Sequence, residues 1–330
     1  MAAYLKPWMS FDDQLNQLIQ RGMTITDRDR ALECLARIGY YRLSGYWYAF
    51  RERSGELVLL DGGKKPGRLR VTRVATDTFK QGATFQNAVD LYVFDKQLRL
   101  LVMDALERIE IGLRVDITHS LGALDPCAYM QPGLLHGDFS GRIIPKTGNS
   151  RHKDWLDRHN QLISRSKEDS IQHCRDKYGL PLPLWIVSEV WDFGTMSTLF
   201  SGMREADQDA ISAKYDISNG RTFASWLRSL NYLRNVCAHH SRLWNRNIID
   251  QPKLPPEREI PWVAPFVGNT RALARCYLLL CITRHLIRVV NPRSTWPQRM
   301  KQHLQQFPQL SHLGLNDAGM GTHAGWDAAW

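Results

Sequence analysis

Hydrophobic residues recur at helical spacing along most of this 330-residue chain. Residues 86–121 are the clearest case, because apolar side chains repeat there every three or four positions and polar side chains fill the positions between them. The apolar positions are Leu91, Phe94, Leu98, Leu101 and Ala105. Comparable spacing, bounded by N-cap residues or by Gly and Pro, predicts further helices over 10–22, 26–43, 153–178, 184–203, 221–244, 269–290 and 295–306. The pattern therefore predicts a mainly α protein.

The helical pattern is interrupted at three places. Residues 46–74 contain short apolar runs and Gly-containing turns, which predict a small β-hairpin or an irregular insert. Residues 125–152 predict a long loop, and 251–267 form a Pro-rich connection. We accordingly predict an N-terminal helical segment with the hairpin over 1–85, a helical domain over 86–290, and a C-terminal helix and tail over 291–330.

Composition and charge narrow the class of protein. Apolar residues make up 43% of the chain, which favours a folded globule over a disordered chain. The formal net charge of +10 favours contact with a polyanion, although charge alone does not separate RNA from DNA or from an acidic protein.

The six cysteines are scattered, without zinc spacing, as expected for thiols in a reducing compartment. No apolar run is long enough to cross a bilayer. We therefore predict a soluble cytoplasmic protein that makes no contact with a membrane.

The segment 231–246 combines His239 and His240 with three arginines and contains no acidic residue. If 221–244 is helical, side chains at offsets of 0, 4, 7 and 11 residues align on one face. These residues are Asn235, His239, Arg242 and Arg246, and the long side chain of Arg234 reaches the same point. Histidine can exchange protons near neutral pH and arginine binds phosphate, so the segment suits a phosphodiester. The alternative is structural, since histidines often cap helices and arginines often line solvated faces.

The stretch 234–246 resembles the hallmark segment of the Abi-like (abortive infection, AbiD/AbiF type) bacterial proteins. Further stretches resemble the same family in the same order, over roughly residues 5 to 300. They are Lys6-Pro7, Ile38-Gly39-Tyr40-Tyr41-Arg42-Leu43-Ser44-Gly45-Tyr46-Trp47, Leu91-Tyr92-Val93-Phe94-Asp95-Lys96-Gln97-Leu98-Arg99, Glu107-Arg108-Ile109-Glu110-Ile111-Gly112-Leu113-Arg114 and Pro183-Leu184-Trp185.

The resemblance implies a HEPN-like helical bundle, a class that includes metal-independent ribonucleases of phage defence and of toxin–antitoxin systems. Its motif is an arginine, a polar residue, and a histidine a few positions later. That motif maps onto Arg234, Asn235 and His239, with His240 as an alternative. The resemblance also implies a homodimer in which two copies of the motif meet.

A second arginine–histidine pair with the same spacing, Arg114 and His119, lies within 86–121. One interpretation is that both motifs face each other in one site. The structural interpretation is that Arg114 pairs with Glu110 one turn earlier, while His119 lies at a helix C-terminus, where a cation suits the dipole.

The predicted function is that of a bacterial phage-defence protein, an endoribonuclease that uses neither a metal ion nor a cofactor. No carboxylate cluster for Mg²⁺ and no Gly-rich nucleotide loop are evident in the sequence. The alternative is a non-catalytic protein that binds a structured non-coding RNA, with Arg242, Asn245 and Arg246 contacting the RNA. A third interpretation gives the motif a purely structural role in a protein that acts through protein contacts.

Overall fold

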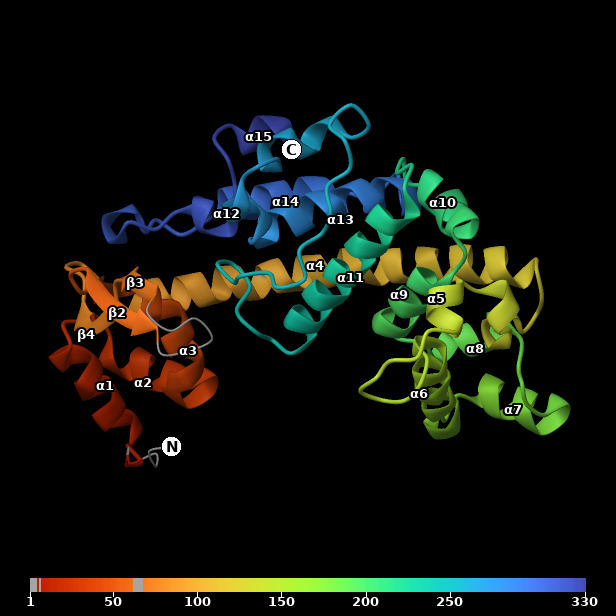
Figure 1. Ribbon diagram of the computed structural model, residues 1–330. Helices are drawn as coiled ribbons and strands as arrows, with labels where there is room; N and C mark the ends of the chain where they lie inside the picture. Colours follow the sequence, from red (N-terminus) through yellow and green to blue (C-terminus); the bar gives the residue numbers. More distant parts are fainter. Residues whose placement is uncertain (1–4, 6, 62–67) are drawn as a thin grey trace. The chain divides into compact units, whose positions relative to one another are not determined.

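A computed structural model describes residues 5, 7–61 and 68–330, with side chains described outside 59–70. Helices dominate the described residues and the strands form only two-stranded sheets, which confirms the predicted mainly α fold with a small β-hairpin (Figure 1). Lys6 and residues 62–67 of the predicted insert lie outside the described residues. The chain divides into two compact units, one of residues 1–98 and 302–319, the other of 99–301 and 320–330.

The first unit begins with three short helices, whose bounds are α1 Phe11–Gln20, α2 Arg28–Ile38 and α3 Tyr40–Trp47, followed by the 3-10 turn η1 Tyr48–Phe50. Helix α1 starts at the predicted N-cap, where the Ser10 hydroxyl accepts a bond from the Asp13 amide at 3.1 Å. The predicted helix 26–43 is wrong in its extent, because Gly39 has a φ of 92° and separates α2 from α3.

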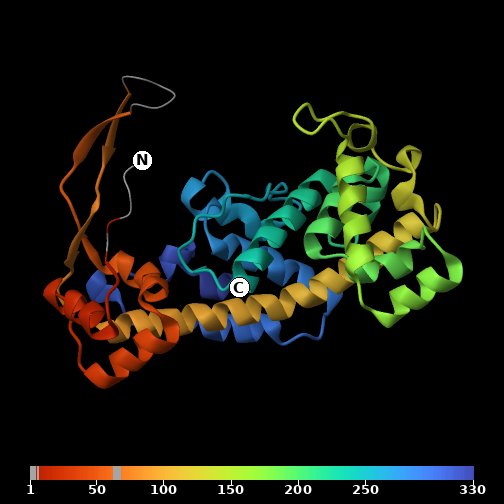
Figure 2. The ribbon, with the colours of Figure 1, turned by 90° about the horizontal axis from the view of Figure 1, so that it is seen from below.

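Four strands of the first unit form one extended antiparallel ribbon, which Figure 2 shows projecting from the helices of that unit. The strands are β1 Arg51–Arg53, β2 Leu57–Asp61, β3 Arg68–Thr72 and β4 Ala75–Phe79. Strand β1 pairs with β4, and β2 pairs with β3. The β structure thus starts later than the predicted 46–74 and continues to Phe79.

Helix α4, Phe85–Gly122, is 38 residues long and confirms the strongest sequence prediction. Its start is fixed by a reciprocal cap. The Asn87 amide donates to the Thr84 hydroxyl at 3.1 Å, and the Thr84 amide donates to the Asn87 side-chain oxygen at 3.1 Å. The helix belongs to the first unit up to Leu98 and to the second unit from Arg99 onward.

The second unit contains most of the remaining helices. In chain order its α-helices are α5 Gly137–Ser140, α6 Arg151–Arg165, α7 Asp169–Tyr178, α8 Leu184–Val187, α9 Phe193–Gly202, α10 Glu205–Ala213, α11 Gly220–Ala238, α12 Thr270–Leu273, α13 Cys276–Val290, α14 Trp296–Gln305 and α15 Trp326–Ala329, of which α14 ends in the first unit. The 3-10 turns that follow η1 are η2 Ala128–Met130, η3 Pro132–Leu134, η4 Ser188–Val190, η5 Pro261–Phe266, η6 Ser311–Leu313 and η7 Asp317–Met320.

The arrangement differs from the sequence prediction at several elements, including the expected helices 153–178 and 269–290, each of which is two helices. The expected helix 184–203 is broken into α8, η4 and α9, because the Asp192 carboxylate caps a new helix. The predicted loop 125–152 contains η2, η3 and α5. Helix α10 was not predicted at all.

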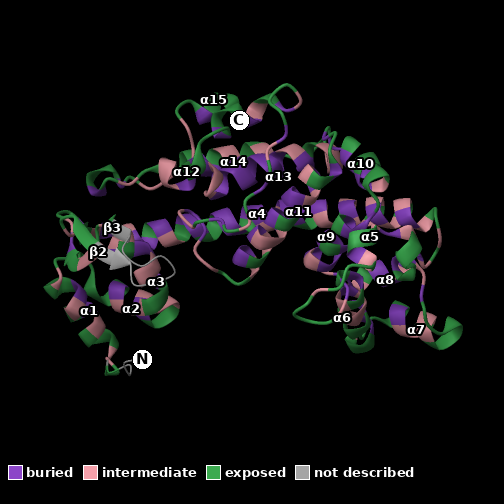
Figure 3. Cartoon of the chain, in the orientation of Figure 1, coloured by how far each residue is buried: buried purple, intermediate pink, exposed green. Residues whose placement is uncertain are grey.

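The core of the second unit is formed by the inner faces of its helices (Figure 3). Helix α13 is buried along almost its whole length, and it contacts α11. Indole rings that are at most 1% exposed fill the spaces between elements; they belong to Trp226, Trp244 and Trp296. Within the described residues, we find no helix with the length and apolar content that crossing a bilayer requires.

Candidate functional site

Helix α11 ends at the segment that the sequence singled out. His239 is its C-cap residue, and His240 adopts the left-handed conformation with a φ of 55°. The His240 amide donates to the Cys237 carbonyl oxygen at 3.0 Å, and the Ser241 amide donates to the Val236 carbonyl oxygen at 3.0 Å. These two bonds form a Schellman motif, which closes the helix and turns the chain away from its axis.

The predicted helix 221–244 is therefore wrong beyond Ala238. The expected alignment of Asn235, His239, Arg242 and Arg246 along one face is wrong for the same reason, since the two arginines follow the Schellman turn. Asn235 and His239 do share a face, because the His239 amide still donates to the Asn235 carbonyl oxygen at 3.0 Å. Both side chains are exposed.

The chain after the turn is held by bonds to its neighbours. Arg246 donates through Nε to the Tyr232 hydroxyl at 2.8 Å, and its guanidinium lies 6.0 Å from the centre of that ring. The carbonyl oxygen of Asn245 accepts a bond from Arg275. The side chain of Arg246 is thus engaged within the protein, and the predicted contacts of Arg242, Asn245 and Arg246 with RNA remain a prediction.

A buried arginine of α4 also supports this turn. Arg99, which is 5% exposed, donates through Nη1 to the Ser241 carbonyl oxygen at 3.4 Å. A buried guanidinium bonded to a backbone carbonyl fixes that part of the chain, because moving the carbonyl away would leave the charge without this acceptor. This contact joins residues 142 positions apart, so sequence spacing does not predict it.

Arg234 and Asn235 line a cavity of about 330 Å³, which we call the motif cavity. Its lining residues come from α6, α9, α11 and the residue that caps α9: Arg158, Asp192, Phe193, Gly194, Thr198, Asn231, Arg234 and Asn235. Arg234 is half-buried and makes no hydrogen bond or ion pair with any described residue. A guanidinium that is free in this way is available to an anion that enters the cavity.

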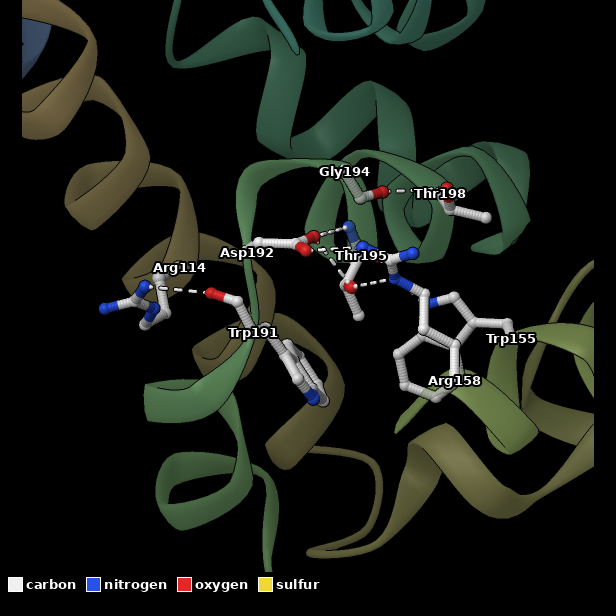
Figure 4. A network of polar contacts seen from close by, with 8 residues as sticks. All are labelled: Arg114, Trp155, Arg158, Trp191, Asp192, Gly194, Thr195 and Thr198. Atoms are coloured by element: carbon white, nitrogen blue, oxygen red, sulfur yellow. Dashed lines mark hydrogen bonds and ion pairs between the residues drawn. The ribbon is translucent and has the colours of Figure 1, made fainter. Parts of the chain in front are cut away.

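Two other residues that line the motif cavity, Arg158 and Asp192, belong to the polar network shown in Figure 4. Asp192 accepts bonds from the Thr195 amide at 2.8 Å and from the Thr195 hydroxyl at 2.9 Å. Arg158 donates to Asp192 at 2.5 Å and to the Thr195 hydroxyl at 3.1 Å. Burial would raise the pKa of Asp192, but these hydrogen bonds and the Arg158 charge outweigh it and hold the pKa below its usual value. Asp192 therefore stays ionised.

Arg114, from the second arginine–histidine pair, has its terminal nitrogens occupied. It donates to the Trp191 carbonyl oxygen at 3.3 Å, as Figure 4 shows, and lies 3.6 Å from Glu110 and 3.5 Å from Glu189. Burial raises the pKa of Glu110, although the charges of Arg114 and Arg234 oppose that shift. Both arginines are therefore close enough to Glu110 to act on it electrostatically.

His119 lines a different cavity, of about 400 Å³, together with Val115 and Trp185. None of the residues that line this cavity lines the motif cavity. The structure thus brings Arg114 near Arg234 through Glu110 but does not bring His119 into the motif cavity.

The Abi-like protein family model matches residues 33–245, which is more than half of the chain. The chain belongs to the Abi-like family. The match includes Arg99, Arg234 and His239 and ends at the Schellman turn and the residues directly after it. No curated protein and no solved structure matches the chain. The family relationship suggests a role in defence against phage.

The geometry of this Abi-like protein adds residues that sequence spacing did not reveal. Arg158, Asp192 and Asn231 line the motif cavity from three separate segments. Only Asp192 left a local signal, since an aspartate three residues before Thr195 is a typical N-cap. Among the described residues, no group of three or more His, Cys, Asp or Glu side chains is arranged to hold a metal ion.

Proposed function

We propose that this Abi-like protein is a metal-independent endoribonuclease of phage defence, with Arg234, Asn235 and His239 at its active site. One observation carries the proposal. Arg234, which has no hydrogen-bond or ion-pair partner among the described residues, shares the motif cavity with Asn235, and the exposed His239 follows one turn later on the face of Asn235. A cation and an amide thus border one open space, and an imidazole follows one helical turn after the amide.

The reaction uses the 2′-hydroxyl of the RNA as nucleophile. His239 takes the proton of that hydroxyl, and the oxygen attacks the adjacent phosphorus as the bond to the 5′-oxygen breaks. The leaving oxygen takes a proton from a second acid, for which His240 or a histidine of a second copy is available. Arg234 stabilises charge on the phosphoryl oxygens, and Asn235 orients the imidazole or a phosphate oxygen. The products are a 2′,3′-cyclic phosphate and a 5′-hydroxyl.

The backbone of His240 supports a role for its side chain. The left-handed position of a Schellman motif is usually occupied by glycine, because a side chain there costs about 1 kcal/mol. A histidine at this position therefore carries a conformational cost that glycine would avoid. Residues held in such conformations cluster at functional sites.

We further propose that the protein acts as a homodimer, in which each motif meets its copy. Light scattering of the purified protein tests this directly. A second test mixes the inactive Arg234→Ala and His239→Ala proteins and measures cleavage. A mixed dimer regains activity only if both copies contribute residues to one site. A monomer that cleaves RNA would contradict the dimer and leave the nuclease intact.

The test of the nuclease is cleavage of cellular RNA in EDTA, followed by mapping of 5′-hydroxyl ends. Wild-type protein is expected to create new ends, while Arg234→Ala and His239→Ala create none. His173→Ala, which removes an exposed histidine from α7, is the matched control and is expected to cleave normally. Strict dependence on Mg²⁺ would overturn the proposal.

The second candidate function is binding of a structured non-coding RNA without cleavage. The positive net charge and the free guanidinium of Arg234 are compatible with it. RNA that copurifies equally with wild type and His239→Ala, with no new ends in either sample, would favour this function over the nuclease.

A further inference from the structure

A second polar cavity adjoins the motif cavity in the unit that contains α11. It has a volume of about 440 Å³, and we call it the basic cavity. The two cavities share the lining residues Gly194, Thr198 and Asn231, so they adjoin, and we call them together the hollow. Together they are lined by six Lys or Arg side chains and three carboxylates, which gives an excess of positive charge.

Three side chains that line this hollow, those of Arg221, Arg228 and Asn235, lie on one stripe of α11, and His239 at the helix end continues the stripe. Arg221, Arg228, Asn235 and His239 are separated by seven, seven and four residues, so at 100° per residue they lie within about 40° of one another around the axis. The distance from Arg221 to Asn235 is about 21 Å at 1.5 Å per residue. The polar stripe therefore runs from the motif toward the N-terminus of α11, opposite to the direction expected from the sequence.

The cations of the basic cavity differ in how far they are already engaged. Arg221 pairs with Glu205. Arg151, Arg228 and Lys253 are exposed, and their charged groups make no hydrogen bond or ion pair with any residue that the structure describes. Three free cations along one hollow favour a ligand that carries several negative charges at intervals, rather than a single small anion.

We propose that the basic cavity is a binding track for single-stranded RNA, along which Arg151, Arg228 and Lys253 contact successive backbone phosphates of a strand whose scissile phosphate lies in the motif cavity. This inference rests on the proposed nuclease function, because that function places the scissile phosphate in the motif cavity. A hollow lined from several sides suits a single strand, since duplex RNA is recognised across its wide, shallow minor groove by its shape.

Gly194 is one of the three residues that line both cavities. A Cβ at this position would lie 3.3 Å from the Asn231 side-chain nitrogen and 3.4 Å from an Asp192 oxygen. A larger side chain would therefore crowd Asn231 and Asp192 where the two cavities adjoin. Gly194→Leu closes the track without removing a charge and complements the charge-removing variants.

The first experiment measures binding, with cleavage prevented by His239→Ala. The probe is a fluorescent single-stranded oligonucleotide of about 12 nucleotides, within the usual range of single-strand sites. In this background, each of Arg151→Ala, Arg228→Ala and Lys253→Ala is expected to reduce the slope of log affinity against log salt concentration by about 0.7, and the triple variant by about 2. Arg288→Ala is the matched control, because it removes an exposed arginine of α13 that lines neither cavity.

The second experiment measures cleavage in the presence of His239. The triple variant and Gly194→Leu are expected to cleave the oligonucleotide at least tenfold more slowly than the Arg288→Ala control, with melting temperatures close to wild type showing that they fold. Unchanged salt slopes and unchanged cleavage would overturn the track while leaving the nuclease in place. Reduced slopes in a protein that cleaves no RNA would overturn the nuclease and support the track. Equal slope changes with a duplex probe would contradict the preference for single strands.

Discussion

Arg114 and Arg234 each precede a histidine by five positions, each lies on a helix of the same unit, and each acts on Glu110. The Nε atom of each is buried without a partner among the described residues, so the difference lies at the terminal nitrogens. Those of Arg114 are engaged by Glu110, Glu189 and the Trp191 carbonyl oxygen. Those of Arg234 border an open cavity.

The difference is set by what packs against each helix. A guanidinium surrounded by carboxylates and a carbonyl stabilises the fold and has little charge left for a ligand. A partly buried guanidinium without such partners raises the free energy of the unliganded protein, and a bound anion lowers it again by accepting hydrogen bonds. Spacing alone does not distinguish the two arginines, because two of the three acceptors of Arg114, Glu189 and the Trp191 carbonyl oxygen, lie more than 70 positions away in the sequence.

The largest expected effect is the difference in RNA cleavage between variants of the two arginine–histidine pairs. Replacing both Arg234 and His239 by alanine is expected to reduce cleavage at least about 10³-fold, since a charge-stabilising donor and an acid–base group are lost together. Replacing both Arg114 and His119 by alanine is expected to leave cleavage per folded molecule within about threefold of wild type. Initial rates on one RNA, normalised to the folded fraction, provide the measurement. Equal losses in both double variants would mean that the two pairs act as one site.

Acid should weaken the contact between α6 and Trp191, whose carbonyl oxygen binds Arg114. His159 accepts a bond from the Trp191 indole at 2.9 Å, and burial lowers its pKa to about 4 from 6.5. The unfolded chain therefore binds a proton more readily, so this contribution to stability is complete above about pH 6.5 and is lost as pH falls toward 4. The loss amounts to about 3 kcal/mol. Urea unfolding at several pH values measures it, and His159→Phe should reduce the dependence, whereas His173→Phe should not.

Arg114→Ala is expected to lower the free energy of unfolding by about 2 kcal/mol, because Glu110 and the Trp191 carbonyl oxygen lose their shared donor. The equivalent loss for Arg234→Ala should be close to zero, as Arg234 has no such partner among the described residues. Chemical denaturation of both variants supplies the comparison. A larger loss for Arg234→Ala would reverse the structural and functional assignments.

His240→Gly separates the backbone of the Schellman turn from its side chain. Glycine tolerates the left-handed conformation, so the free energy of unfolding should stay constant or rise by up to about 1 kcal/mol. If the imidazole takes part in cleavage, activity falls while the melting temperature does not. Full activity in this variant would remove His240 from the proposed mechanism and leave the second proton to another group.

The smallest effect concerns Arg246, which was first expected to contact RNA. Because it bonds to the Tyr232 hydroxyl, Arg246→Ala should cost about 1 kcal/mol of stability. Its effect on the salt dependence of RNA binding should be smaller than that of Arg228→Ala. A larger effect of Arg246→Ala than of Arg228→Ala, measured with the same oligonucleotide, would indicate that RNA binds to the segment after α11.

Local features of this fold could be predicted from the sequence. The apolar repeat of α4 and the Ser10 cap of α1 were correctly predicted, because each depends on residues close together in the chain. The end of α11 was predicted wrongly for two reasons. His240 occupies a position where glycine is the usual signal for a helix end, and Trp244 matches the helical spacing although it lies beyond the helix. Trp244 is buried, but it lies in the non-helical segment that follows α11.

The candidate site was predictable only along its own helix. Arg234, Asn235 and His239 form one short segment, whereas Arg158 and Asp192 reach the motif cavity from α6 and from the cap of α9. The proposed track was missed because Arg151 and Lys253 lie about 80 and 20 residues from the motif, and only folding brings them to the same hollow.

The chain crosses between its two compact units three times, after Leu98, after Lys301 and after Gly319, and the first two crossings fall inside α4 and α14. Neither unit is therefore one continuous piece of chain, and no single truncation yields either of them intact. A protease that nicks the protein between the units would have to open a helix to do so. Deletions that separate the units would disrupt these helices, so a loss of activity in a deletion variant would reflect misfolding. Point substitutions in the whole chain are therefore the better way to assign its activities to residues.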